Sequence, residues 1–230
     1  MKLTMGSRFM KPWAMLVLMM AAAQAVAATS GEQPIALDTP SGKVAGTLRL
    51  PAGADKAPAV LIIAGSGPTD RDGNIAMLPD HNDSLKMLAE ALAQSGFASV
   101  RYDKRGIGES RAAAPDESQL RFDTYVTDAA AWIARLKADP RFSSVAVIGH
   151  SEGALIGMLA AERAGASAYV SLAGVADTPG VVLRKQMAGK LPPPIAADNE
   201  RIPLVWSRAG RWPRCRRRSR PCTVPACSLI

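Results

Sequence analysis

The pentapeptide Gly-His-Ser-Glu-Gly at residues 149–153 constrains the fold of this chain more than any other segment. It fits the pattern Gly-x-Ser-x-Gly, follows the β-branched, apolar residues 145–148 and precedes the Ala- and Leu-rich residues 152–163. A serine between a buried strand and a helix must occupy a strained turn, and Gly149 and Gly153 keep neighbouring backbone from colliding with it. The pentapeptide, called the elbow below, therefore predicts a strand, a tight turn with the serine at its tip, and a helix.

Ser151 is the candidate nucleophile in this turn. The turn would lift its Oγ clear of the sheet and place it at the N-terminus of the helix, where backbone N–H groups face developing negative charge. A strand–turn–helix junction without chemistry is the structural alternative. The motif, the preceding strand and the following helix together favour the catalytic interpretation.

Buried strands and amphipathic helices alternate along the body of the chain. The expected strands are residues 35–37, 44–50, 58–63, 98–102, 145–148 and 168–172, and the expected helices are residues 84–95, 124–137 and 152–163. Asp83 or Ser84 is expected to cap the first helix. This order predicts the α/β class, with a mostly parallel sheet, helices on both faces, and an N-terminal antiparallel hairpin that turns at Pro40–Lys43.

A glycine-rich loop, residues 64–74, comes directly after the third expected strand. Gly65 and Gly67 let the backbone turn its N–H groups toward a substrate oxygen. In a serine hydrolase of this architecture, one oxyanion donor follows the nucleophile and another comes from this loop, so the expected pair is the backbone N–H groups of Glu152 and Ser66. A phosphate-binding loop would need a Lys-Ser/Thr ending that is missing here, and a plain glycine-rich turn with solvated charges is the structural alternative.

A second loop, residues 103–110, follows the next expected strand and contains Gly-x-Gly. It does not fit a dinucleotide-binding fingerprint, because no third glycine follows at the right spacing and no helix is expected to open there. We expect a structural loop at the carboxyl edge of the sheet, in which Asp103 and Arg105 brace the neighbouring loops.

Together, the elbow and the two loops resemble the α/β-hydrolase superfamily, in particular bacterial serine hydrolases of the serine-aminopeptidase-like or esterase-like kind. The resemblance covers residues 33–200. It implies that Ser151 is the nucleophile and that the backbone N–H groups of Ser66 and Glu152 form the oxyanion hole. The implied reaction is acyl transfer to water through an acyl-serine intermediate, without a metal or an organic cofactor. The implied substrate is a small-molecule ester or a peptide-like acyl bond.

A general base and its orienting carboxylate are missing from the sequence after Ser151. In α/β-hydrolases an acid and then a histidine follow the serine, but the two histidines here, His81 and His150, both precede it. His150 is expected to point away from the serine and His81 to lie in a polar loop; a role for either as substitute base is the alternative to a structural or solvent-exposed one. Asp177 and Asp198 are expected to be surface residues. The triad is thus incomplete, which predicts impaired activity; a non-catalytic binding protein of this fold is the alternative.

The first 27 residues predict export. Three basic residues precede the apolar segment Trp13–Ala23, which leads into small residues suited to cleavage before Ala28. The segment is shorter than the ~20 residues that span a bilayer, although an uncleaved anchor or a buried helix is the alternative. The mature protein is expected in the periplasm or outside the cell, without a stable membrane span.

The excess positive charge sits in residues 201–230. The chain carries a formal charge of +8, yet residues 1–200 contain 20 basic and 20 acidic residues, whereas the last 30 contain eight Arg and no Lys, Asp or Glu. These 30 residues also hold all three cysteines and show no helical or strand period. We interpret them as the product of a frameshift or gene-prediction error near codon 201, which replaced the last strands with the catalytic acid and histidine.

A basic arm that binds nucleic acid or anionic lipid is the alternative for this tail. Secretion would separate it from nucleic acid, and no recognition motif precedes it, so no nucleic-acid partner is expected. The expected organisation is a signal peptide at 1–27, an incomplete hydrolase domain at 28–200 and a non-native tail at 201–230. Residues 174–200 are the expected start of a lid over the acyl pocket.

Overall fold

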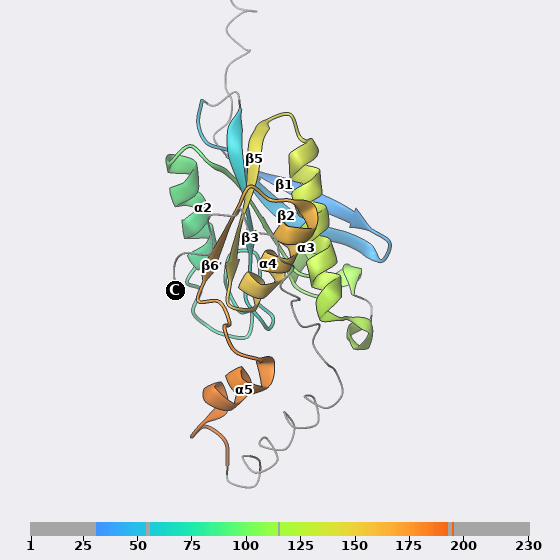
Figure 1. Cartoon of the computed structure of the whole chain (residues 1–230), viewed down its shortest axis with the longest axis vertical. Coiled ribbons are helices and arrows are strands. Elements are labelled where there is room, and N and C mark those ends of the chain that lie inside the picture. Colours follow the sequence, from blue (N-terminus) through green and yellow to red (C-terminus); the bar gives the residue numbers. More distant parts are fainter. Residues whose placement is uncertain (1–30, 54–55, 115, 193–194, 196–230) are drawn as a thin grey trace, which may run out of the picture. The chain divides into compact units, whose positions relative to one another are not determined.

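The computed structural model describes residues 31–53, 56–114, 116–192 and 195. The expected signal peptide at 1–27 and the arginine-rich tail at 201–230 lie outside the described residues. The chain divides after Gly174 into two units, which are described separately. The first unit contains the sheet and its helices (Figure 1). The second contains helix α5, Pro179–Met187, within the segment expected to begin a lid.

A six-stranded sheet forms the centre of the first unit. Its strands are β1 (Glu32–Thr39), β2 (Gly42–Arg49), β3 (Ala57–Ile63), β4 (Ala98–Tyr102), β5 (Phe142–His150) and β6 (Ala168–Leu172), in the spatial order β1-β2-β4-β3-β5-β6. β1 and β2 form an antiparallel hairpin, β2 pairs antiparallel with β4, and the other pairs are parallel. The expected mostly parallel sheet with an N-terminal hairpin is confirmed.

Helices cover both faces of this sheet, as the alternating sequence pattern predicts. Helix α2 (Ser84–Gln94) lies on one face, and α3 (Phe122–Ala138) and α4 (Glu152–Ala164) lie on the other (Figure 1). Two short 3₁₀ helices, η1 (Gly108–Ala113) and η2 (Glu117–Gln119), connect β4 to α3. The opening of η1 corrects the expectation that no helix begins in the 103–110 loop, although one of this length does not create a dinucleotide-type helix N-terminus.

Strand β3 runs through the middle of the core. Val60 and Ile62 pack in the apolar cluster beneath α2, and Leu61 and Ile63 pack in the larger cluster beneath α3 and α4. Because successive side chains of a strand point to opposite faces, a strand covered on both faces must be apolar at every position. The uninterrupted apolar run of this strand follows from that requirement.

The start of α2 differs from the sequence prediction. Asp83 stands at the N-cap position with a left-handed backbone (φ 48°), and it makes no side-chain capping hydrogen bond. Its carboxylate instead accepts a hydrogen bond from Asn74 Nδ2 at 2.6 Å. The prediction that Asp83 or Ser84 caps the helix is therefore wrong: the glycine-rich loop takes up the carboxylate and ties itself to α2.

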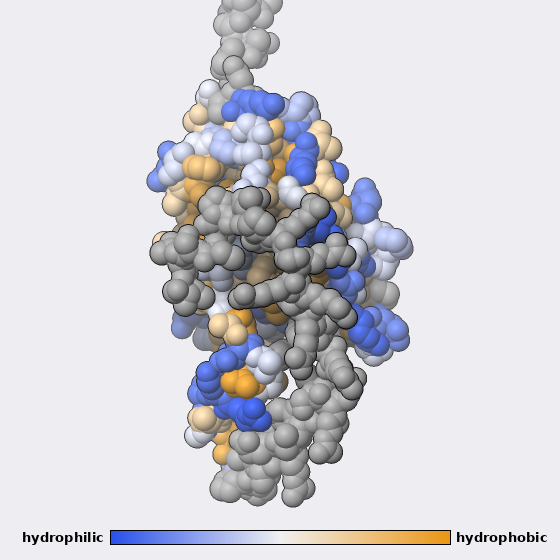
Figure 2. All heavy atoms as spheres, in the orientation of Figure 1, coloured by the Kyte–Doolittle hydropathy of each residue, from blue (hydrophilic) through white to orange (hydrophobic). Residues whose placement is uncertain are grey.

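The surface of the first unit is polar where the hairpin projects and more apolar at the opposite edge. Hydrophilic side chains gather toward the β1–β2 hairpin at the right of Figure 2, where Lys43 and Asp38 form an exposed ion pair. Strand β6 forms the opposite edge of the sheet, and it exposes Val170 and Leu172. No helix within the described ranges has the length and apolar character that crossing a membrane requires.

Candidate active site

Three loops meet at the carboxyl ends of neighbouring parallel strands. The glycine-rich loop follows β3, the 103–110 loop follows β4, and the elbow follows β5. Because β3 lies between β4 and β5, these loops leave the same edge of the sheet side by side. The helices after β3 and β4 cover opposite faces, so the loops stand at a topological switch point, where open α/β sheets bind their ligands.

The elbow has the strained geometry that its sequence predicts. Ser151, at the N-cap of α4, has φ 53° and ψ −119°, a conformation that side chains rarely adopt. Its backbone N–H donates to the carbonyl oxygen of Leu172 at the end of β6, with a distance of 2.9 Å. This hydrogen bond to a neighbouring strand fixes the strained backbone conformation. Ser151 is half-buried at the N-terminus of the helix.

The glycines of the elbow leave room for backbone. A Cβ added at Gly149 would lie 2.1 Å from the carbonyl oxygen of Gly153, and one added at Gly153 would lie 2.4 Å from that of Ile63. A Cβ at Gly65 would approach His150 Nδ1 at 3.1 Å and Ser151 Cβ at 3.4 Å. The glycine-rich loop therefore packs directly against the elbow, and both glycines of the motif are needed for close backbone contact.

The two expected oxyanion donors flank this contact. Ser66 is exposed and follows the buried Gly65, and its N–H makes no hydrogen bond with any described residue. Glu152 is the first residue of α4, so its N–H is one of the helix-terminal groups without an intrahelical acceptor. Gly67, with φ 75°, has a conformation that favours glycine. The structure brings Gly65, Ser151 and Glu152 together.

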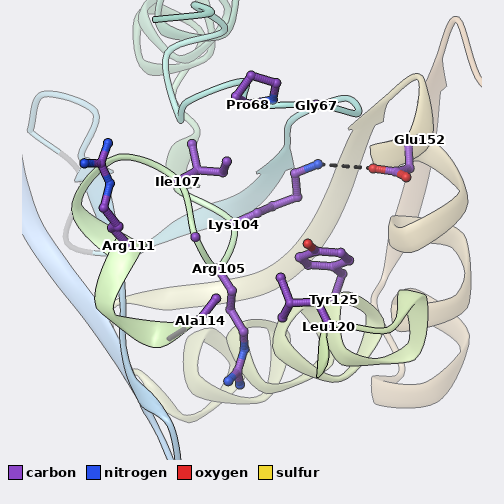
Figure 3. A pocket seen from close by; sticks show the side chains of 11 residues that line it. Gly67, Pro68, Lys104, Arg105, Ile107, Arg111, Ala114, Leu120, Tyr125 and Glu152 are labelled. Atoms are coloured by element: carbon purple, nitrogen blue, oxygen red, sulfur yellow. Dashed lines mark hydrogen bonds and ion pairs between the residues drawn. The ribbon is translucent and has the colours of Figure 1, made fainter. Parts of the chain in front are cut away.

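Lys104 is a site residue that the sequence reasoning missed. Its side chain is only 4% exposed, and Nζ donates to the carbonyl oxygen of Gly65 at 2.6 Å and lies 3.2 Å from Glu152 Oε2. The ring of Tyr125 lies beneath it, with its centroid 5.5 Å from Nζ (Figure 3). The signal available in the sequence was a lysine two residues beyond a wholly buried strand, between the two expected braces Asp103 and Arg105.

Asp103 and Arg105 brace the loops, as expected. Asp103 accepts hydrogen bonds from the backbone N–H and the guanidinium of Arg71 at 2.8 and 2.6 Å, which fastens the glycine-rich loop to β4. Burial lowers the pKa of Arg71, but hydrogen bonds and charge from Asp103 and then Glu109 outweigh it, so the net shift is upward. Arg105 forms a two-pronged pair with Asp128 of α3, and this hydrogen bonding raises the pKa of Arg105.

The two histidines do not form a hydrogen bond with Ser151 in the part of the chain that the structure describes. His150 is exposed and lies alongside Gly65, and His81 is exposed in the loop before α2. Asp177 accepts from Lys185 Nζ at 2.6 Å within the second unit, and Asp198 lies outside the described residues. Among the described residues, no group of three or more His, Cys, Asp or Glu side chains is arranged to hold a metal ion.

A cavity of about 510 Å³ opens beside the elbow. Gly67 and Pro68 line one side, Lys104 and Glu152 one end, and Leu120 and Tyr125 the opposite side (Figure 3). Arg105, Ile107, Arg111 and Ala114 complete the wall together with Gly106. Ser151 itself is not part of the lining, whereas Glu152, the next residue along the chain, is.

A strained serine at a strand–helix elbow, on a mostly parallel sheet covered on both faces, defines an α/β-hydrolase. Comparison with known families agrees with this class: the family described as serine aminopeptidase, S33, matches residues 78–202. That match covers more than half of the chain, so the chain belongs to the serine aminopeptidase S33 family of α/β-hydrolases. The glycine-rich loop lies before the matched residues.

One curated sequence and several solved structures resemble this chain. The chain is 33% identical to the esterase EstD of Thermotoga maritima over 143 residues, which are 62% of this chain and 33% of EstD. The chain thus spans about a third of the length of this curated relative. Est1E from Butyrivibrio proteoclasticus, solved with ferulic acid, shares the fold with a TM-score of 0.52 at 23% identity, over 68% of this chain and 57% of Est1E. GrgF from Penicillium sp. sh18 gives a TM-score of 0.51 at 20% identity, over 78% and 56% of the two chains.

Proposed function

We propose that this protein is a serine hydrolase that acts on carboxylic esters or peptide-like acyl bonds of small molecules. Ser151 Oγ attacks the carbonyl carbon, and the π electrons of the carbonyl move to its oxygen. The N–H groups of Ser66 and Glu152 stabilise that oxyanion. Its collapse breaks the bond to the alcohol or amine, which departs with the proton that Ser151 Oγ has released to solvent, and leaves an acyl-serine. Water then adds to the acyl carbon, the acid departs, and a proton from that water returns to Oγ to regenerate the serine.

The single observation that carries this proposal is the conformation of Ser151. A non-glycine residue at φ 53° and ψ −119°, packed between glycines that admit no Cβ, is strained at a position where glycine would be easier. The hydroxyl gains a place at the N-terminus of a 13-residue helix, where the helix dipole favours negative charge. The esterase relative supports an ester as substrate, and the adjacent cavity provides space for it.

We further propose that this chain, as its sequence stands, hydrolyses esters slowly. The serine proton needs a base, and no histidine follows Ser151. The exposed apolar residues of edge strand β6 are the surface that the last strands of the hydrolase domain, with the acid and histidine, would cover. Translation of the other two reading frames downstream of codon 201 tests the frameshift: hydrophobic strands with an Asp and then a His support it, and frames without them refute it.

Turnover of a p-nitrophenyl ester tests the catalytic proposal. We expect the chain to act above the buffer rate but at least about 10³-fold below an intact serine hydrolase, because an oxyanion hole without the base retains only a residual advantage. Ser151→Ala should remove the serine-dependent part of this rate. Turnover equal to that of an intact hydrolase would contradict the proposal that the triad is incomplete. Identical rates for the unsubstituted protein and Ser151→Ala would contradict the assignment of Ser151 as the nucleophile.

One observation favours a second candidate, an exported binding protein that keeps the fold without catalysis. Neither histidine forms a hydrogen bond with Ser151 in the described part of the chain, and none follows it in the sequence. Such a protein would bind an ester in the cavity without consuming it. Calorimetry with a non-hydrolysed ester analogue, read beside the turnover assay, separates the two functions.

Export is part of the proposal and rests on residues 1–27. The basic start, the apolar segment and the small residues before Ala28 are the features of a cleaved signal peptide. N-terminal sequencing of the protein recovered from the periplasm should begin near Ala28. Recovery from the cytoplasm with residue Met1 retained would contradict it.

A further inference from the structure

Lys104 is a buried cation that acyl transfer by a serine does not itself require. Burial of an ammonium group costs free energy unless the group is paired and hydrogen-bonded. The Nζ of Lys104 contacts two partners. One is the carbonyl oxygen of Gly65 at 2.6 Å, and the other is the carboxylate of Glu152 at 3.2 Å. Figure 3 shows the side chain reaching from the loop after β4 toward Glu152, above Tyr125. Both partners adjoin the proposed oxyanion donors.

The first contact sets the direction of the Ser66 N–H. The carbonyl of Gly65 and the N–H of Ser66 belong to the same peptide unit, and no cis peptide bond occurs among the described residues. In a planar trans peptide the C=O and N–H groups point in opposite directions. An ammonium that holds the carbonyl oxygen on one side therefore turns the N–H to the other side, away from Lys104.

The same contact also strengthens the donor. A hydrogen bond from a charged ammonium is stronger than one between neutral groups, and hydrogen bonds in series polarise one another. Withdrawal of electron density through the Gly65 carbonyl makes the Ser66 N–H more positive. A more positive N–H stabilises a developing oxyanion better than it stabilises a neutral carbonyl.

The second contact links the other donor. The Glu152 side chain pairs with the same Nζ, and the N–H of Glu152 is the other proposed donor. A cation beside the N-terminus of α4 is unfavourable with respect to the helix dipole, so the helix alone gives no reason for a lysine here. Lys104 instead joins the glycine-rich loop to the elbow, across 39 residues of sequence on one side and 48 on the other.

We propose that Lys104 is the positioning residue of the oxyanion hole: it orients and polarises the Gly65–Ser66 peptide and fastens that peptide to Glu152. This inference rests on the proposed function for its catalytic meaning. Its structural content, that the ammonium controls the Ser66 N–H, can be measured whether or not the chain hydrolyses esters.

The test compares Lys104→Met with Lys137→Met in the full chain. Lys137 is the matched control, because its Nζ also donates to two backbone carbonyls, those of Ala164 and Gly165, at 3.0 Å each, but at the far end of α4. The first readout is the ¹⁵N–¹H resonance of the Ser66 amide. We expect it to move in Lys104→Met, to stay in Lys137→Met and to return toward its original position in Lys104→Arg, which restores a cationic donor.

The second readout is the affinity for phenylboronic acid, which forms a tetrahedral adduct with an active-site serine. Loss of one oxyanion donor slows a serine hydrolase by about 10²–10³-fold, and a donor that is only misdirected should weaken the adduct by roughly tenfold. We expect that weakening in Lys104→Met but not in Lys137→Met.

A Ser66 resonance unmoved by Lys104→Met, or moved equally by Lys137→Met, overturns the inference. Failure of every chain to bind the boronic acid, together with a Ser66 shift specific to Lys104, overturns the proposed function and leaves the positioning contact standing. If Lys104→Met does not fold, Lys104→Gln takes its place, because it also removes the charge. We expect it to show the same shift of the Ser66 amide resonance and the same loss of affinity for phenylboronic acid.

Discussion

Ser151 combines backbone strain with a hydroxyl group that makes no hydrogen bond to any described residue. Its φ of 53° and ψ of −119° lie in a region that side chains rarely occupy, and such a conformation costs about 1–3 kcal/mol. It persists because its N–H is held by Leu172 and because Gly149 and Gly153 admit the neighbouring backbone. The strained backbone of Ser151 therefore lowers the stability of the fold while it fixes the position of Oγ.

The strain predicts an unusual order of stabilities for two substitutions. We expect Ser151→Gly to be more stable than Ser151→Ala by about 1 kcal/mol, because glycine relieves the strain that alanine keeps. At an ordinary strand position glycine is less stable than alanine by roughly 0.5–1 kcal/mol. The free energy of unfolding in urea measures both.

Ser143 provides the control for this comparison. It lies on the same strand, β5, is exposed and has no positive φ. Ser143→Gly should be less stable than Ser143→Ala. If the two residues give the same order, the backbone of Ser151 is not strained in solution.

At the scale of the elements, one buried ion pair fastens the loop after β4 to helix α3. Arg105 Nε and Nη2 donate to the two carboxylate oxygens of Asp128 at 2.6 and 2.7 Å. The side chains are 11% and 5% exposed. Arg105 also contacts Ser41 in the hairpin turn, so a single guanidinium joins the loop after β4, helix α3 and the hairpin.

We expect Asp128→Ala to lower the free energy of unfolding by about 3–5 kcal/mol, because it leaves the largely buried charge of Arg105 without its carboxylate partner. Asp123→Ala is the matched control on the same helix. Its carboxylate pairs with Arg163 at 2.8 Å, but both side chains are largely exposed, and such pairs contribute at most about 1 kcal/mol. Equal losses in the two variants would show that the Arg105 pair is no more than a surface contact.

The sequence predicted most elements of the first unit because their signals are local. The apolar run of β3, the helical spacing in α2 and α3, and the strand–turn–helix pattern of the elbow are each complete within a short segment. Lys104 was missed because its meaning depends on two loops that approach only in the folded chain. The capping prediction for Asp83 was wrong for a similar reason. Its local pattern suits an N-cap, but in the folded chain its carboxylate accepts a hydrogen bond from Asn74 instead.

At the scale of the whole molecule, Glu32 ties the hairpin to the centre of the sheet. On β1, it accepts hydrogen bonds from Arg101 of β4 at 2.9 Å and from Arg49 of β2 at 3.1 Å. Burial raises the pKa of Glu32, but hydrogen bonds and charge from Arg101 and then Arg49 outweigh it, so the net shift is below its ordinary value of 4.5. Folding therefore favours the ionised form of this carboxyl group.

This shift predicts a dependence of stability on pH. A carboxyl group whose pKa is lower in the folded state stabilises the fold above its unfolded pKa, and the contribution disappears as the pH falls through the folded pKa. We expect Glu32→Gln to lower the free energy of unfolding by about 1 kcal/mol at pH 7 and by progressively less below pH 4.5. Glu162→Gln, which removes an exposed carboxylate of α4, should show neither effect. A constant difference between wild type and Glu32→Gln across this pH range would contradict the linkage.

The proposed function depends on Ser151 being a nucleophile held in the strained elbow. Reaction of the full chain with a fluorophosphonate, followed by peptide mapping in a mass spectrometer, tests this most directly. We predict one phosphonyl group per chain, on the peptide that contains Ser151. Phosphonylation spread over exposed serines, or unchanged by Ser151→Ala, would contradict the account.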